Sequence, residues 1–214
     1  MDLRAFAGPA ALSEDQMESV IELYIAYFNR APDAVGLFFW ATAFDNGTTL
    51  DDMAKLFIDQ DETRAAYPDG TSHLEFAETV YNNVLGRTPD VAGLNFWVGL
   101  LDNGAVERAD FILEVLRGAR ADAPVDASAE FIAQQAEDQQ YLEVKTDIGA
   151  FFAVHKGMSD VQEAAAAMAL FDGTAAGIEA STDAIEAFFA DALDAENGDF
   201  LMPLIGVLDD PFAA

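Results

Sequence analysis

The chain has 214 residues, 52% of them hydrophobic, which is enough for one large core or two small ones. Its 39 Asp and Glu outnumber ten Lys and Arg, and the formal net charge of −29 disfavours nucleic acid and anionic lipid as partners because like charges repel. The lack of cysteine excludes disulfides, thiol catalysis and zinc–thiolate sites, and no apolar run reaches the roughly 18 residues of a membrane helix, so we expect no membrane insertion.

An 18-residue motif occurs twice in the first half of the chain. Residues 30–47, RAPDAVGLFFWATAFDNG, return as residues 87–104, RTPDVAGLNFWVGLLDNG, at a constant offset of 57 residues. Ten of the 18 positions are identical, and both tryptophans of the chain lie inside the motif. A repeat at a fixed offset indicates a duplicated structural unit.

Helix signals divide each copy into about three helices. In the first copy, Ser13 predicts the start of a helix that runs to Phe28. Pro32 and Asp33 then start a second helix, because Pro suits the first helical turn and Asp favours the positive end of the helix dipole. Asn-Gly at residues 46–47 is a good left-handed stop, and a third helix follows. The second copy repeats this plan.

We expect the shared residues of the motif to be structural. Six of the ten identical positions carry this structural prediction: Arg30, Pro32, Asp33, Gly36, Trp40 and Gly47 in the first copy, and Arg87, Pro89, Asp90, Gly93, Trp97 and Gly104 in the second. In this interpretation each arginine pairs with the aspartate three residues later, each inner glycine lets a neighbouring helix approach, and each tryptophan fills a core.

The alternative is a calcium site in the turns of the repeat. Its candidate ligands are Asp33, Asp45, Asp90 and Asp102 together with nearby carbonyls, because calcium prefers oxygen ligands. Neither copy has the alternating acidic loop of an EF-hand.

From Tyr24 and again from Tyr81, the order and spacing of Arg, Pro-Asp, Gly-Leu, Phe-Trp and Asn-Gly resemble the bacterial domain-of-unknown-function 4214 family, over about residues 17–120. The resemblance implies an all-helical fold similar to the linker domains of phycobilisomes. It also implies a place among surface-layer and other type I-secreted proteins of Gram-negative bacteria, whose helical region attaches to lipopolysaccharide with the help of calcium. The sequence departs from the pattern at Asn29, where the second copy has Gly86, and no calcium-binding nonapeptide array follows.

The composition changes after residue 120. Residues 121–214 hold 19 acidic residues and only two basic ones, Lys145 and Lys156. Residues 128–156 predict one long helix. A Ser159 cap predicts the start of an Ala-rich helix, and Ser181 or Thr182 the start of another.

The C-terminal tail, from residue 198, has two interpretations. It is either a segment docked on the fold or an uncleaved type I secretion signal, a class that lacks basic residues and mixes acidic with apolar groups. The N-terminus has no basic region followed by an apolar core, so we expect no Sec signal peptide. The two histidines, His73 and His155, do not form a zinc-protease motif, and we found no phosphate loop and no G-x-S-x-G motif, so we expect no enzyme activity.

Together these patterns predict an all-α protein. We expect a tandem helical repeat domain over residues 1–120, with three-helix copies at about 17–66 and 74–120, and an acidic, Ala-rich helical bundle with a tail over residues 121–214. The expected function is that of a secreted cell-surface structural protein. It would self-assemble into a surface layer or filament as a homo-oligomer or polymer, attach to lipopolysaccharide or another surface glycan, or both, with calcium assisting. The alternative is a monomeric, non-catalytic adaptor that docks other proteins.

Overall fold

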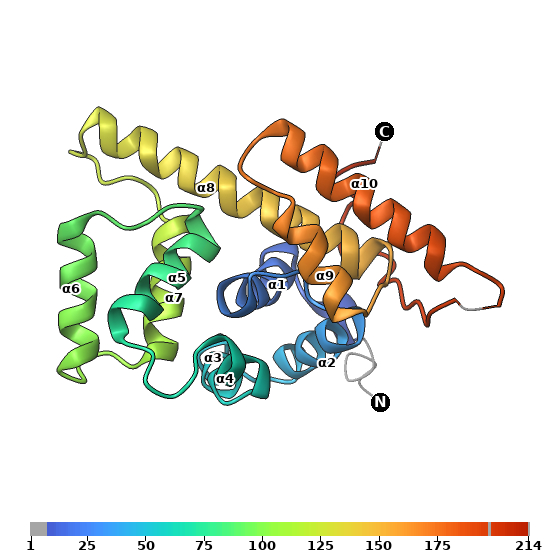
Figure 1. The fold of residues 1–214 in the computed structure, drawn as a ribbon, viewed down its shortest axis with the longest axis horizontal. Helices are drawn as coiled ribbons and strands as arrows, with labels where there is room; N and C mark the ends of the chain where they lie inside the picture. Colours follow the sequence, from blue (N-terminus) through green and yellow to red (C-terminus); the bar gives the residue numbers. More distant parts are fainter. Residues whose placement is uncertain (1–7, 197, 214) are drawn as a thin grey trace. The chain divides into compact units, whose positions relative to one another are not determined.

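The computed structural model describes residues 8–196 and 198–213, and over these residues it contains ten α-helices and no strand (Figure 1). The all-α prediction is therefore confirmed for this part of the chain. The helical segments are η2 (Gly8–Ala11, a 3₁₀ helix), α1 (Glu14–Phe28), α2 (Ala34–Asp45), α3 (Leu50–Ile58), α4 (Asp61–Ala66), α5 (His73–Leu85), α6 (Val91–Asp102), α7 (Arg108–Arg120), α8 (Ala129–Ala150), η3 (Phe151–His155, a π-helical turn), α9 (Val161–Ala169) and α10 (Ala175–Ala192). None of the described helices is long and apolar enough to cross a membrane.

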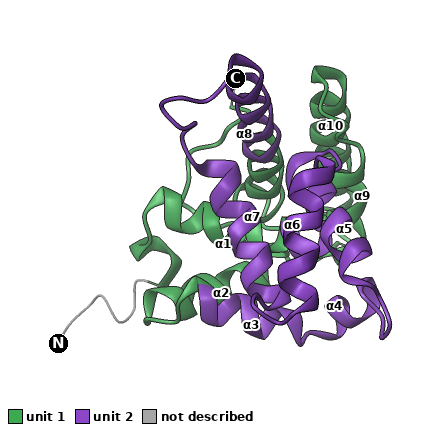
Figure 2. Cartoon of the chain, turned by 90° about the vertical axis from the view of Figure 1, so that its left-hand side faces the viewer, with its two compact units in different colours: residues 1–25, 29–50, 144–214 green, residues 26–28, 51–143 purple. Residues whose placement is uncertain are grey.

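The helices form two compact units, shown in green and purple in Figure 2. Unit 1 comprises residues 1–25, 29–50 and 144–214, and unit 2 comprises residues 26–28 and 51–143. This division differs from the predicted boundary at residue 120, because η3 packs against α2 and therefore shares a core with the first half of the chain. The predicted second three-helix copy, residues 74–120, lies wholly in unit 2, whereas the predicted first one, residues 17–66, is divided between the units. The tandem three-helix arrangement therefore stays a prediction.

The local structure of the two copies is nevertheless the same at the helix starts. Asp33 and Asp90 are the N-caps of α2 and α6, which begin 57 residues apart. The Oδ1 atom of Asp33 accepts a hydrogen bond from the Gly36 N–H at 2.7 Å, and that of Asp90 accepts one from the Gly93 N–H at 2.9 Å. Each Asp thus satisfies a backbone donor that a helix start leaves without an intrahelical partner. The predicted Pro-Asp helix starts are confirmed.

The departure between the copies at Asn29 and Gly86 has a simple conformational explanation. Asn29 ends α1 with φ 52° and Gly86 ends α5 with φ 65°, and both are left-handed. Their N–H groups donate to the carbonyls of Ile25 at 2.9 Å and Asn82 at 3.0 Å. Asn and Gly are the residues that adopt this conformation most readily, so the exchange preserves the helix end.

The core of unit 2 lies between α5, α6 and α7, which pack on one another. Phe76 and Phe111 are fully buried, with ring centroids 5.8 Å apart. The Tyr27 hydroxyl, also buried, donates to the Ala54 carbonyl at 2.6 Å and so ties the end of α1 to α3. Buried aromatic side chains therefore form much of the core of unit 2.

In unit 1 the C-terminal tail is docked against the end of the long helix. The predicted helix over residues 128–156 is observed as α8 continued by η3. The Met202 and Leu204 N–H groups donate to the carbonyls of Gly157 and Val154, each at 2.8 Å. The docked-segment interpretation therefore describes the folded state, and the secretion interpretation stays a prediction.

Two predicted helix starts in the second half are wrong. The N-cap of α9 is Asp160, one residue after Ser159, and its Oδ1 accepts from two backbone N–H groups, at 2.8 Å and 2.9 Å. Helix α10 begins after Thr174, so Ser181 and Thr182 lie inside it. The Thr182 hydroxyl donates back to helix carbonyls three and four residues earlier, at 3.0 Å each, which lets a capping-type residue occupy a helix interior. Asn-Gly at residues 197–198 predicts the end of this helix, but α10 ends at Ala192; Asn197 itself lies outside the described residues.

A candidate binding pocket in unit 2

Unit 2 contains a pocket of about 380 Å³ whose walls come from α5, α6, α7 and the first half of α8. Its volume is within the usual range for small-ligand sites. The wall side chains are of two kinds, aromatic and hydrogen-bonding. The aromatic ones are Tyr81, Trp97 and Phe131, and the hydrogen-bonding ones are Arg87, Asp90, Glu114, Gln134, Gln135 and Asp138.

The aromatic wall of the pocket packs against the core of unit 2. The Trp97 ring packs edge-on against the buried Phe111 ring, with centroids 5.3 Å apart, and against Phe96 at the same distance. Burial raises the pKa of the Tyr81 hydroxyl, while a hydrogen bond with Trp97 lowers it, so the hydroxyl stays protonated at neutral pH and can both donate and accept. Phe131, on α8, is 52% exposed and borders the opening.

The polar wall is organised by one ion pair. Arg87 binds Asp138 through two parallel hydrogen bonds, Nε to Oδ1 at 2.7 Å and Nη2 to Oδ2 at 2.5 Å. The Gln134 amide also donates to Asp138 Oδ1, at 3.0 Å. The hydrogen bond to Asp138 raises the pKa of Arg87. Because the guanidinium and the carboxylate neutralise each other, this pair shapes the pocket without giving it a net positive charge.

A pair of glutamines ties α8 to the end of α7. The Nε2 groups of Gln135 and Gln139 both donate to the Ala121 carbonyl, the second at 2.9 Å. The Oε1 atom of Gln135 is buried and accepts no hydrogen bond from the described residues. The wall of the pocket therefore includes one acceptor that is not satisfied by the protein.

The corresponding residues of the first copy are buried. Tyr24 and Arg30, the counterparts of Tyr81 and Arg87, are each only 4% exposed, and the Arg30 guanidinium lies 5.1 Å from the centre of the Tyr24 ring. The predicted pair between Arg30 and Asp33 is confirmed at 3.8 Å. A Cβ on Gly36 would lie 2.6 Å from the Tyr24 hydroxyl, so this glycine does admit a residue of the neighbouring helix.

The second copy departs from the predicted roles at two positions. Arg87 pairs with Asp138, on α8, rather than with Asp90. A Cβ on Gly93 would come within 3.4 Å only of the Asp90 carboxylate, at 3.1 Å, so this glycine accommodates its own helix cap and no neighbouring helix. Tyr24 and Arg30 are thus buried in unit 1, whereas their counterparts Tyr81 and Arg87 line a pocket in unit 2.

The prediction that both tryptophans fill a core is wrong. Trp40 and Trp97 are only half-buried, and the phenylalanine before each is largely exposed, Phe39 at 61% and Phe96 at 60%. Each Phe-Trp pair has a similar edge-to-face geometry, with centroids 5.1 Å and 5.3 Å apart. The reason is that α2 and α6 have mainly apolar sequences, which do not reveal which face of the helix is buried.

The four candidate calcium ligands are not brought together. Asp33 and Asp45 lie at opposite ends of α2, and Asp90 and Asp102 at opposite ends of α6; a helix of 12 residues separates the members of each pair by about 18 Å. In the part of the chain that the structure describes, no group of three or more His, Asp or Glu is placed to hold a metal ion.

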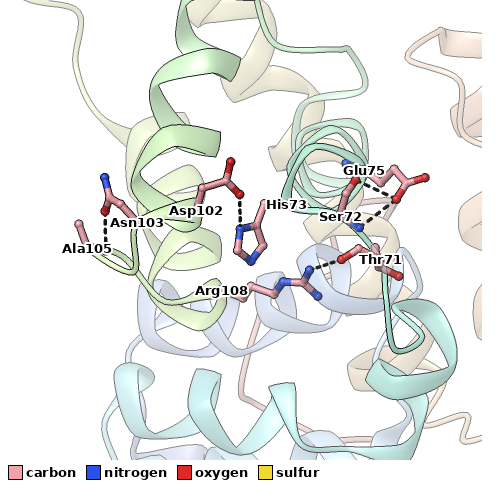
Figure 3. A network of polar contacts seen from close by, with 8 residues as sticks. All are labelled: Thr71, Ser72, His73, Glu75, Asp102, Asn103, Ala105 and Arg108. Carbon is pink, nitrogen blue, oxygen red and sulfur yellow. Dashed lines mark hydrogen bonds and ion pairs between the residues drawn. The ribbon is translucent and has the colours of Figure 1, made fainter.

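Asp102 instead belongs to a polar network at one end of unit 2 (Figure 3). Its Oδ1 lies 2.9 Å from Nδ1 of His73, the first residue of α5. Close by, Arg108 at the start of α7 donates to the Thr71 carbonyl and lies 4.6 Å from the centre of the Phe76 ring. These contacts fix the starts of α5 and α7 against the end of α6, which is a structural role.

Comparison with known proteins identifies one part of the chain. No curated protein and no solved structure matches it. A family model described as Domain of unknown function (DUF4214) matches residues 54–123, which include the whole second copy of the motif and α5, α6 and α7. Three walls of the pocket therefore lie in the matched segment, and the fourth, on α8, lies outside it. The chain contains a DUF4214 domain at residues 54–123.

Proposed function

We propose that this protein is a non-catalytic, glycan-binding module of a secreted cell-surface protein, and that the glycan binds in the pocket of unit 2. The observation that carries the proposal is the combination of three aromatic side chains with six hydrogen-bonding ones around one pocket of about 380 Å³. A sugar presents C–H groups on the faces of its ring and hydroxyls around the edge. An aromatic wall beside fixed donors and acceptors matches both.

The polar groups of the pocket suit sugar hydroxyls better than an anionic group such as a carboxylate or phosphate. Arg87 already uses Nε and Nη2 on Asp138, so it offers little to a carboxylate or phosphate ligand. The carboxylate and amide oxygens of the wall are acceptors, and hydroxyl groups can donate to them. The half-exposed Trp97 and Phe131 leave the pocket accessible from solvent.

The location and assembly of the protein are proposed from the sequence. The DUF4214 domain, the acidic composition and the absence of Lys and Arg after Lys156 support secretion by an uncleaved C-terminal type I signal. The identical caps of α2 and α6 support a tandem helical repeat of the kind found in surface-layer proteins and phycobilisome linkers. Lipopolysaccharide or another surface glycan is the proposed partner, with calcium bridging carboxylates where the glycan is anionic.

Fluorescence of the two tryptophans tests glycan binding directly. In a Trp40→Phe variant, Trp97 is the single remaining reporter and lies in the pocket wall. We expect neutral and amine-bearing oligosaccharides to change its emission saturably, and we expect no change in a Trp97→Phe variant that retains Trp40. Absence of any saturable response over a panel of surface glycans would refute the proposal.

A matched pair of phenylalanines supplies the control. Phe131 is 52% exposed and lines the pocket, whereas Phe39 is 61% exposed and lies in unit 1. Both can be truncated at small cost in stability because neither is buried. Phe131→Ala should weaken binding by about tenfold, the effect of losing roughly 1.4 kcal/mol of contact, and Phe39→Ala should leave it unchanged. Equal affinities of the two variants would place the binding site elsewhere.

Self-association is the second candidate, and the repeated exposed phenylalanines favour it. Phe39 and Phe96 occupy equivalent positions of the two copies and offer similar aromatic surfaces, which a second copy of the chain can cover. Light scattering with millimolar calcium and then with chelator measures assembly. Large calcium-dependent particles that disappear in the Phe39→Ala/Phe96→Ala variant support a lattice or filament, and a monomer under both conditions favours the monomeric module or adaptor.

A further inference from the structure

The two copies of the motif differ in what lies over the tyrosine ring. In unit 1 the Arg30 guanidinium lies 5.1 Å from the centre of the Tyr24 ring, a cation–π contact that both residues make while almost fully buried. In unit 2 the equivalent arginine, Arg87, directs Nε and Nη2 to Asp138 instead. The protein's own cation is held by the carboxylate on α8, while the Tyr81 ring lines the pocket.

The charges around the pocket are also unbalanced. Its lining includes three carboxylates, Asp90, Glu114 and Asp138, and one cation, Arg87. Just outside the lining, Arg117 pairs with Glu114 at 2.6 Å and with Asp51 at 3.2 Å, which adds one positive and one negative charge. The lining and these two neighbours together carry a net charge of −2, on a chain whose net charge is −29.

We propose that the pocket of unit 2 recognises a positively charged amino group on its ligand, and that the ligand is therefore an amino sugar with a free ammonium. The ammonium lies against the rings of Tyr81 and Trp97 and makes the kind of cation–π contact that the Arg30 guanidinium makes with Tyr24. Aromatic faces attract cations, and Asp90 adds a charge of opposite sign at the edge of the pocket. This inference rests on the proposed glycan binding and adds the charge of the ligand to it.

The proposal separates amine-bearing glycans from anionic ones. An ammonium is attracted both by the aromatic rings and by the carboxylates. An uncharged N-acetyl group has no positive charge for either to attract. A uronic acid is repelled by the same carboxylates and binds only where a divalent cation bridges the two. Binding of the amino sugar requires no calcium.

The test uses the full chain carrying Trp40→Phe, with Trp97 emission as the readout. The probes are a glucosamine oligosaccharide, its fully N-acetylated counterpart and a galacturonate oligosaccharide, each measured in chelator at a pH where the amine is protonated. We expect the amine-bearing oligosaccharide to bind about tenfold tighter than the N-acetylated one, in keeping with a cation–π contact supported by a carboxylate. The difference should shrink in 0.5 M salt, because screening weakens exposed charge interactions. The galacturonate should not bind.

Two equivalent helix caps provide the variants. Asp90→Asn keeps a side-chain oxygen that can cap α6 but removes the charge at the pocket, and Asp33→Asn makes the same change on α2 in unit 1. We expect Asp90→Asn to lose several-fold in affinity for the amino sugar and little for the N-acetylated one, and Asp33→Asn to lose neither. Equal binding of the amino and N-acetylated sugars would overturn the charge selection while leaving glycan binding in place. No response to any sugar would overturn both proposals, and tighter binding of a lysine-containing peptide would overturn the assignment to a sugar.

Discussion

A double-mutant cycle on Arg87 and Asp138 examines how the pocket is held together. The two residues are 51 positions apart and join the end of α5 to α8 through two hydrogen bonds, at 2.7 Å and 2.5 Å. The Asp138 side chain is 10% exposed and that of Arg87 is 31% exposed. Asp138→Leu removes the carboxylate and leaves the guanidinium without this partner, while Arg87→Met leaves the buried carboxylate with only Gln134.

The expected magnitude follows from this partial burial. Removing one partner of a fully buried ion pair costs about 3–5 kcal/mol in the free energy of unfolding. Because Arg87 stays nearly a third exposed, water compensates part of the loss, and we expect about 2 kcal/mol for Asp138→Leu. Arg87→Met should cost about 3 kcal/mol, since the carboxylate that it leaves is the more deeply buried group. The double variant should lose less than the sum, with a coupling energy of about 1–2 kcal/mol.

Urea unfolding followed by circular dichroism measures these free energies. Hydrogen exchange of α8 amides accompanies it, because a chain of two compact units need not unfold in one step. A loss of 2 kcal/mol corresponds to a fall in melting temperature of about 4–8 °C for a protein of this size. Additivity of the two substitutions within about 0.5 kcal/mol would refute the reasoning, because it would show that the two side chains do not act as a pair.

Four further substitutions test other parts of the structure. Gly36→Ala should destabilise the chain by about 1–3 kcal/mol, because its Cβ would lie 2.6 Å from the Tyr24 hydroxyl and 2.7 Å from the Asp33 carboxylate. Gly93→Ala should cost less, because its Cβ would meet only the Asp90 carboxylate, at 3.1 Å; chemical denaturation measures both, and equal effects would contradict this account. Burial lowers the pKa of Lys145 to about 7, so between pH 7 and about 10 the unfolded chain binds more protons. The free energy of unfolding should therefore rise with pH across that window and stay low below pH 7, and Lys145→Met should flatten the rise. Leu204→Ala should loosen the docked tail, which limited proteolysis detects as faster cleavage of the C-terminus.

Features set by neighbours along the chain were predictable from the sequence. The helix starts at Asp33 and Asp90 depend on a carboxylate that reaches an N–H three residues away, and the helix ends at Asn29 and Gly86 depend on the backbone conformation of one residue. Both are local effects with a strong sequence signature. The same cues fail where two residues compete for one cap, as Ser159 and Asp160 do.

The pocket could not be found in this way. Its polar wall depends on Asp138, and its rim on Phe131, and no local pattern links these residues to Arg87, more than 40 positions earlier. Nor does the motif itself distinguish its two copies, in which Tyr24 and Tyr81 occupy the same position of the same pattern.

The sequence by itself determined that the chain is helical, that helices begin after Asp33 and Asp90, and that one motif is used twice. Only the tertiary structure decided that Tyr24 is buried beneath the Arg30 guanidinium, whereas Tyr81 lines a pocket and Arg87 binds Asp138. The physical reason is that a helix start or end requires contacts over three or four residues, whereas the exposure of a side chain depends on which distant helix packs beside it.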